Sequence, residues 1–144
     1  VTYATANTYF SLQLNTGVWD RASDGDKTKA LTMATAIIDR LAFYGDKADP
    51  SQTNQFPRDD DVTVPQNILD ACCEIAIALL ANKNPDREFQ NLFVQSEKVE
   101  GWSTTYDRSR HPEHVVFGVP SVTAWRLLKP YLRDYNSFNL ERVS

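Results

Sequence analysis

The chain has 144 residues, of which 42% are hydrophobic and 24% charged, and these fractions are ordinary for a single globular domain and exclude disorder throughout. Its 15 Lys/Arg and 19 Asp/Glu are unevenly placed: residues 1–100 hold 9 basic and 15 acidic side chains, whereas residues 101–144 hold 6 and 4. Tight binding to nucleic acid phosphates needs a basic stripe, so this distribution weighs against nucleic acid as the principal tight ligand.

Two helices are predicted in the first third of the chain. A short helix falls within residues 2–15, with Thr5 as its N-cap. A longer helix is predicted over residues 24–44, because Ser23 offers an N-cap and Gly45 a left-handed terminator. Its apolar side chains recur at helical spacing, at Leu31, Ala34, Ile37, Ile38 and Leu41.

Residues 45–64 are predicted to form a long irregular connection, with Phe56 as its one large apolar anchor. A loop of this length inside a small domain is often functional or packed on itself. Pro65 then suits the first turn of a central helix. Its broad apolar face, which implies contacts on more than one side, comprises Ile68, Ala71, Cys72, Ile75, Ala76, Leu79 and Leu80.

The last third combines a predicted ribbon with a final helix. Alternating β-branched and aromatic residues predict a two-stranded β-ribbon at about residues 91–106, which must lean on the helices or pair with another chain. Residues 107–118 are predicted as loop, and a last helix starts at Pro120 and ends or kinks at Pro130. The predicted fold is mainly α: a connector-type bundle of four to five helices with a small β-hairpin, a domain over residues 1–130 and an extended C-terminal arm over residues 131–144.

The two cysteines, Cys72 and Cys73, are adjacent in an apolar run and are predicted to be core residues of a reduced, intracellular protein. No run of about 18 apolar residues and no classical signal sequence is apparent, so no membrane partner is expected.

Enzymatic chemistry is not expected. His111 and His114 flank Glu113 and could contribute to a metal site, but Pro112 interrupts a regular helix and no third ligand is evident, so a solvated loop is the better interpretation. Asp59, Asp60 and Asp61 lack the spacing and turn glycine of a calcium loop. No nucleophile motif or phosphate-binding loop occurs, which leaves paired carboxylates as the one hidden route to hydrolysis. No catalytic residue, metal or cofactor is predicted.

The C-terminal residues are unusually apolar for a tail. Large apolar side chains continue to the end of the chain, interspersed with charges that keep it soluble, at Tyr131, Leu132, Arg133, Tyr135, Phe138, Leu140, Arg142 and Val143. Plain fraying fits this pattern poorly. Two interpretations remain open: the segment packs back onto its own domain, or it is an arm that orders on a neighbouring subunit.

The run QFPRDDDVTVPQNILDACCEIAIALL resembles a pattern in the head-to-tail connector proteins (adaptor or head-completion proteins) of tailed bacteriophages. In that family an aromatic-Pro-Arg element, here Phe56-Pro57-Arg58, precedes an Ile/Val-Pro pair, here Val64-Pro65, that opens a helix rich in Ala and Leu. The segments TTYDRSR and WRLLKPYLRD are similar to chains of the group often labelled DnaT-like single-stranded-DNA-binding. The similarity covers most of the chain, and none of its motifs is catalytic.

The resemblance implies a structural virion protein. Such proteins form a homo-oligomeric ring, typically of twelve subunits, between the portal and the tail, made in the host cytoplasm and located in the neck. The genome passes through the lumen without sequence-specific binding, and a tail-side protein contacts the other face. The C-terminal arm docks on the portal, which would make residues 131–143 the partner-binding segment; truncation after Leu132 should then leave the monomer folded and abolish attachment.

The alternative from another functional class is a single-stranded-DNA-binding protein. It would need aromatic platforms flanked by Lys or Arg. The nearest such cluster in the sequence comprises Trp102, Tyr106, Arg108 and Arg110.

Overall fold

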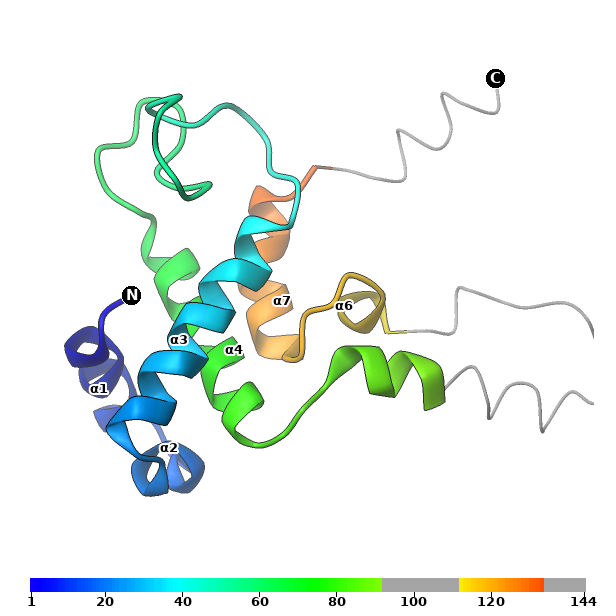
Figure 1. Ribbon diagram of the computed structural model, residues 1–144. Coiled ribbons are helices and arrows are strands. Elements are labelled where there is room, and N and C mark those ends of the chain that lie inside the picture. Colours follow the sequence, from blue (N-terminus) through cyan, green and yellow to red (C-terminus); the bar gives the residue numbers. More distant parts are fainter. Residues whose placement is uncertain (92–111, 134–144) are drawn as a thin grey trace, which may run out of the picture.

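The computed structural model describes residues 1–91 and 112–133 of the chain, and these residues form a mainly helical domain (Figure 1). In the part that the structure describes, α3 lies along α4 and α4 lies against α7, so α4 is the central helix as predicted. The elements in chain order are α1 (Tyr3–Ser11), α2 (Gly17–Arg21), α3 (Asp24–Asp39), α4 (Gln66–Leu80), a helix described over 85–91, α6 (Glu113–Val116), α7 (Val122–Leu128) and the 3₁₀ turn η2 (Lys129–Tyr131).

The caps explain where the first helices begin. Thr2, rather than the predicted Thr5, caps α1: its hydroxyl accepts a hydrogen bond from Thr5 N at 3.3 Å, while Thr2 N donates to Thr5 Oγ1 at 3.0 Å. Thr5 is therefore the third residue of the helix in a reciprocal capping box. α3 starts as predicted, with Ser23 Oγ accepting from Asp26 N at 3.1 Å.

α3 ends earlier than the sequence pattern indicates. The predicted helix ran to about Tyr44, but the structure ends it at Asp39. Phe43 instead takes part in an antiparallel bridge with Leu132 near the other end of the described chain. Gly45 does have the predicted positive φ of 76°, but it shapes the following loop instead of terminating the helix.

The predicted central helix is present as α4, but it begins at Gln66, so Pro65 is its N-cap and not its first helical residue. Cys72 and Cys73 are both 3% exposed and belong to the core, as predicted. On its other side α4 meets α1, where Tyr9 donates a 2.6 Å hydrogen bond to Glu74. The apolar core thus surrounds α4 and includes Ala6, Phe10, Trp19, Leu31, Ile38, Phe43, Phe56, Ile75, Val119, Trp125 and Leu128.

The region after α4 differs from the prediction. Asn84 Oδ1 accepts from the main chain of Asp86 at 3.0 Å and thereby caps a helix described over 85–91. The predicted β-ribbon of about 91–106 lies outside the described residues except for Asn91, which is helical. The described residues hold no sheet, only the isolated bridges Phe43–Leu132 and Lys47–Arg58, so the small β-hairpin is not supported.

Residues 112–121 also contain more regular secondary structure than predicted. Part of the predicted loop of residues 107–118 forms the short helix α6, and α7 starts at Val122 after Ser121, rather than at Pro120, because Ser121 Oγ accepts from Ala124 N at 3.1 Å. Phe117 stacks on Trp125 with ring centroids 5.3 Å apart. Among the described residues, no helix has the length and hydropathy needed to cross a membrane.

Candidate functional site at the C-terminal seam

The C-terminal end of the described chain is joined to the segment after α3 by a short antiparallel pairing. We call this pairing, formed by residues 42–44 and 131–133, the C-terminal seam. Tyr44 N donates to Tyr131 O at 3.0 Å, and Arg133 N donates to Ala42 O at 3.1 Å. Arg133 adds a side-chain bond from Nε to Phe43 O at 3.0 Å.

The seam extends just past residue 130, where the sequence places the domain boundary. Leu132 is only 8% exposed and is part of the core, and Tyr131 is half-buried against it. Burial of Leu132 and pairing of the main chain on both sides of it hold the chain to the domain as far as Arg133. The remaining predicted partner-binding residues lie outside the described residues, so their role stays a prediction: Tyr135, Phe138, Leu140, Arg142 and Val143.

Arg58, the last residue of the aromatic-Pro-Arg element, links the 45–64 loop to the seam by hydrogen bonds. It is 8% exposed, and its guanidinium donates to Tyr44 O at 2.8 Å, to Gly45 O, and to both the main-chain and side-chain oxygens of Gln55, at 3.1 and 2.8 Å. These acceptors are uncharged oxygens, so the planar fork bonds several carbonyls at once. Arg58 therefore holds the fold of the 45–64 loop.

Aromatic side chains connect this loop to the seam. Phe56 meets Phe43 edge-on with centroids 4.7 Å apart, and it meets Tyr131 in the same manner at 5.9 Å. The guanidinium carbon of Arg58 lies 5.9 Å from the Phe43 ring and 6.0 Å from the Phe56 ring. The predicted irregular connection is thus packed on itself and on the C-terminal end of the chain, with the Phe56–Pro57 peptide in the cis form.

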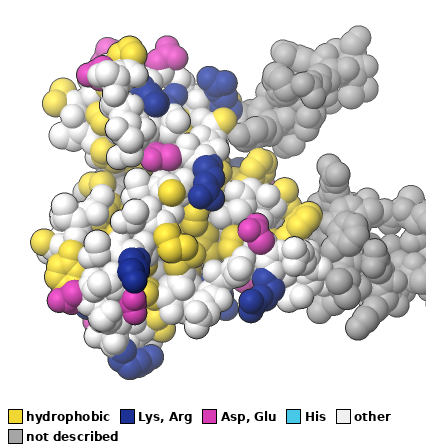
Figure 2. Space-filling model, viewed as in Figure 1, with side chains coloured by type: hydrophobic (Ala, Val, Ile, Leu, Met, Phe, Trp, Pro, Cys, Tyr) yellow, Lys and Arg dark blue, Asp and Glu magenta, His cyan; other side chains and the backbone are white. Residues whose placement is uncertain are grey.

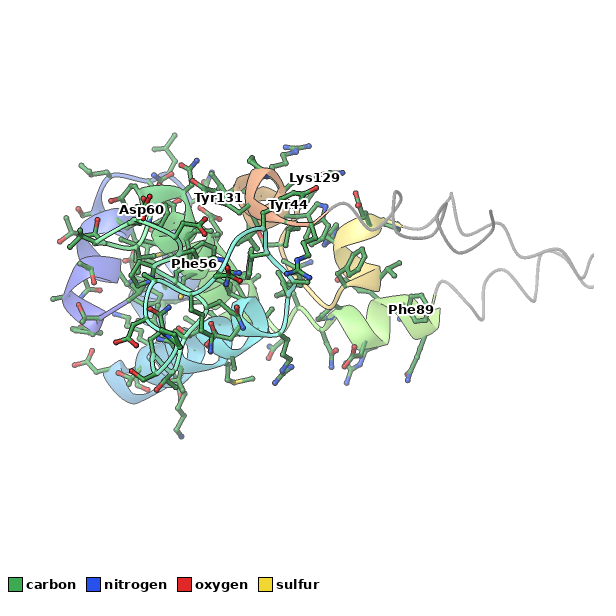
Figure 3. All side chains as sticks on the ribbon, turned by 90° about the horizontal axis from the view of Figure 1, so that it is seen from above. Tyr44, Phe56, Asp60, Phe89, Lys129 and Tyr131 are labelled. Atoms are coloured by element: carbon green, nitrogen blue, oxygen red, sulfur yellow. The ribbon has the colours of Figure 1, made fainter. Side chains whose placement is uncertain are left out.

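The outer side of the seam presents one aromatic ring and several cations. The Tyr44 side chain is 56% exposed, and Arg126, Lys129 and Arg133 are exposed as well. Figure 3, which labels Tyr44, Lys129 and Tyr131, shows these three residues gathered at the end of α7. We call the set Tyr44, Arg126, Lys129 and Arg133 the seam surface. Residues 114–133 contain no Asp or Glu, and Glu113 pairs with Lys129 at 2.7 Å.

The structure gives no support to the candidate metal ligands among the described residues. His114 Nδ1 donates to Val119 O at 2.8 Å, which uses one ring nitrogen within its own turn, and His111 lies outside the described residues. Asp59 accepts a hydrogen bond from Asp46 N at 3.0 Å. Within residues 1–91 and 112–133, no group of three His, Cys, Asp or Glu side chains could hold a metal ion.

The cysteines are unsuited to nucleophilic chemistry. Burial raises the pKa of the Cys73 thiol to about 12 and also raises the pKa of Cys72. Both side chains are therefore protonated near neutral pH, and a protonated thiol is a poor nucleophile.

A small pocket of about 70 Å³ lies between α3, α4 and the 45–64 loop. Its lining is mostly apolar and includes Ile38, Phe56, Val64 and Ile68, with Asp39 among the polar groups. A space of this size can take a few water molecules but not a nucleotide.

Sequence patterns did not identify the seam surface. Tyr44 was assigned to the end of a helix, and Lys129 and Arg133 to either side of a boundary between domain and arm. One sequence signal could have pointed to its cations: residues 114–133 include Arg126, Lys129 and Arg133 but no Asp or Glu. The cluster predicted for the alternative function, Trp102, Tyr106, Arg108 and Arg110, lies outside the described residues.

The chain matches the model of a known protein family. A family model described as "Putative DnaT-like ssDNA binding protein" matches residues 1–143. No curated protein and no solved structure gives a significant match.

Proposed function

The chain belongs to the DnaT-like ssDNA-binding family, and from this premise we propose that it binds single-stranded DNA and performs no bond chemistry. The observation that carries the proposal is the family match, because it extends over residues 1–143. The seam surface supports it, since single strands are bound by aromatic rings on which bases stack and by cations that follow the phosphates. Of these two kinds of group, Arg126, Lys129 and Arg133 offer exposed cations on the described domain.

The expected affinity is modest. Residues 1–91 and 112–133 carry 11 Lys/Arg and 14 Asp/Glu, so the domain as a whole repels a polyanion. On the face drawn in Figure 2, dark blue side chains are scattered among magenta ones and form no continuous stripe. Local cations and aromatic side chains would therefore have to supply the binding free energy.

The proposal is tested by a salt titration. The full chain is titrated into a fluorescein-labelled oligo(dT), and the anisotropy is followed from about 20 to about 300 mM NaCl, with the same length of duplex as the control. We expect binding at low salt that weakens as salt rises and that favours the single strand. Absence of binding at the lowest salt would contradict the proposal.

A second candidate function is the ring connector of a phage neck. It is favoured by the aromatic-Pro-Arg element and Val64-Pro65, which resemble the connector pattern, and by the acidic balance of the domain, which would let DNA slide without adhering. In this proposal about twelve copies would form a ring between portal and tail-side proteins in the virion. Because the seam ties Tyr131–Arg133 to the domain, docking on the portal would fall to the residues after Arg133.

The two candidates are separated by assembly and partner binding. A connector should form rings visible by negative-stain electron microscopy, alone or with its portal, and should bind DNA little at any salt. A chain truncated after Arg133 should keep its fold and lose the portal. If the protein binds single strands as a monomer and retains no portal, the connector proposal fails.

A further inference from the structure

We propose that the pocket between α3, α4 and the 45–64 loop receives one valine-sized side chain of a partner protein, and that a neighbouring Lys or Arg of that partner pairs with Asp39. This contact would be separate from DNA binding and does not depend on it. Three features of the described residues carry it: a buried apolar floor, a carboxylate at the rim, and walls that other contacts hold in place.

The floor of the pocket is apolar and already formed. The pocket lies beneath the 45–64 loop, between the last turns of α3 and the first turns of α4 (Figure 1). Ile38, Phe56, Ile68 and Cys72 line it and are at most 8% exposed. A volume of about 70 Å³ gives room for about three carbon atoms, in proportion to a cavity of about 150 Å³ that takes benzene. An isopropyl group fits this space, whereas an aromatic ring does not.

Contacts outside the pocket hold its walls in place. Phe56 meets Phe43 edge-on at a centroid distance of 4.7 Å and Tyr131 at 5.9 Å. On the side of the two helices, Thr35 Oγ1 and Cys72 Sγ are hydrogen-bonded at 3.6 Å. A ligand that enters therefore has few protein groups to order, which lowers the entropic cost of binding.

The rim carries one negative charge. Asp39, the last residue of α3, is half-buried, and its Oδ1 accepts a hydrogen bond from Gln55 N at 3.0 Å. Among the described residues no cation pairs with this carboxylate, and the amino group of Val1, which also lines the pocket, is no exception. The carbonyl end of a helix adds partial negative charge at the same place. Since Asp39 is the one charged side chain of the lining, the rim favours a cation.

These features select an aliphatic side chain that has a cation beside it. A Lys or Arg side chain that entered the pocket itself would place its charge against Ile38, Phe56 and Ile68, which offer no acceptor, and burying a charge in this way is costly. The basic group therefore belongs at the rim with Asp39, and the hydrocarbon belongs inside. The partner that fits is a protein segment in which a valine-sized residue stands next to Lys or Arg.

The size of the side chain is tested by methyl NMR on the full chain. Of its isoleucines, Ile38 and Ile68 line the pocket and report on it, whereas Ile37, Ile75 and Ile77 serve as controls. The probe is N-acetyl-valyl-arginine amide, added up to about 20 mM because the burial of one small side chain supports only weak binding. We expect the δ1 methyl signals of Ile38 and Ile68 to shift saturably. Probes with glycine or phenylalanine in place of valine should shift neither signal, because the first leaves the pocket empty and the second does not fit.

The role of Asp39 is tested with a probe of opposite charge. N-acetyl-valyl-glutamate amide should bind the parent chain roughly two- to fivefold more weakly than the arginine probe, the effect expected of one exposed ion pair. In Asp39→Asn, whose amide oxygen can still accept from Gln55 N, the two probes should bind alike. The matched control Asp26→Asn, which changes an exposed carboxylate at the other end of α3, should keep the preference for arginine.

Several outcomes would overturn the inference. The pocket is not a site for this side chain if Ile38 and Ile68 do not shift at the highest probe concentration, or if the glycine probe shifts them equally. If their signals follow the protein concentration without any probe, the occupant is a second copy of the chain and not another protein. If Asp26→Asn loses the preference for arginine as Asp39→Asn does, the net charge and not Asp39 selects the cation. Binding to oligo(dT) is measured separately and is unaffected by any of these results.

Discussion

Leu132 pairs antiparallel with Phe43, so the end of the described chain is tied to the segment that follows α3. Leu132 is 8% exposed and Phe43 is 2% exposed, and both belong to the same core as the central helix. Main-chain bonds from Tyr44 and Arg133 flank the pair. The seam is consequently part of the folded domain.

Two truncated chains should distinguish the contribution of the seam to stability from that of the residues beyond it. A chain ending at Arg133 keeps every seam contact and should unfold at nearly the same urea concentration as the full chain. A chain ending at Pro130 loses Leu132 and the three hydrogen bonds across the seam, and removal of one buried leucine side chain alone costs about 2–5 kcal/mol. Urea unfolding followed by circular dichroism measures both. Equal stability of the two truncated chains would show that the seam does not contribute to the fold.

Arg58 should be required for stability because its buried guanidinium donates to three main-chain carbonyl groups of the 45–64 loop and the seam. Arg58→Ala leaves Tyr44 O, Gly45 O and Gln55 O without their donors, and Arg58→Lys restores a charge but not the planar fork. We expect a loss of about 3 kcal/mol or more for Arg58→Ala and about 2 kcal/mol for Arg58→Lys, measured by urea unfolding.

The control for Arg58 is Arg40→Ala, because Arg40 is an exposed arginine at the end of α3. Its removal should change the free energy of unfolding by less than about 0.5 kcal/mol. If Arg58→Ala is as mild as Arg40→Ala, the guanidinium is not what holds the 45–64 loop.

The sequence predicts the helices well because their signals are local. The apolar face of α4 and the Ser23 cap of α3 are patterns within one element, and both were found. The end of α3 was misplaced because Phe43 leaves the helix for a partner, Leu132, that lies far along the chain. No local periodicity carries that information.

The candidate site was harder to predict than the fold for the same reason. Phe56-Pro57-Arg58 was recognised as a motif, but the role of Arg58 follows from its hydrogen bonds to Tyr44 O and Gly45 O. These two residues lie 14 and 13 positions earlier in the sequence. Tyr44 and Arg133 become neighbours only through the seam. Their types and spacing in the sequence gave no reason to combine them.

Substitutions at Gly45 and Gly118 should distinguish the cost of backbone strain from the cost of a steric clash. Both have positive φ, 76° and 78°. A Cβ at Gly45 would clash with the Asp59 carboxylate, whereas a Cβ at Gly118 would meet nothing within 4 Å. Gly118→Ala should therefore cost about 1–2 kcal/mol, the cost of a left-handed backbone for a residue with a Cβ.

Gly45→Ala should cost clearly more than Gly118→Ala in the same urea experiment. Asp59 would have to move, and its carboxylate would then lose the hydrogen bond from Asp46 N. In the double variant Gly45→Ala/Asp59→Ala the clash is absent. The loss of unfolding free energy that Gly45→Ala adds to the single variant Asp59→Ala should therefore be close to the loss caused by Gly118→Ala. Equal costs for the two single variants would contradict the close approach of Asp59 to Gly45.

Cys73 should make the folded domain less stable at alkaline pH. Burial raises the pKa of its thiol to about 12 in the folded state, whereas an unfolded cysteine ionises near about 8.5. Below the unfolded pKa both states hold the proton and the full stability is present; as pH rises from there toward the folded pKa, only the unfolded state loses its proton. Stability should therefore fall by up to about 1.4 kcal/mol per pH unit in this window. Urea unfolding at pH 7.5, 9 and 10 measures the fall, and Cys73→Ala, which removes the thiol from both states, should show a smaller one; an identical pH dependence in the two proteins would mean that the Cys73 thiol is not the group responsible.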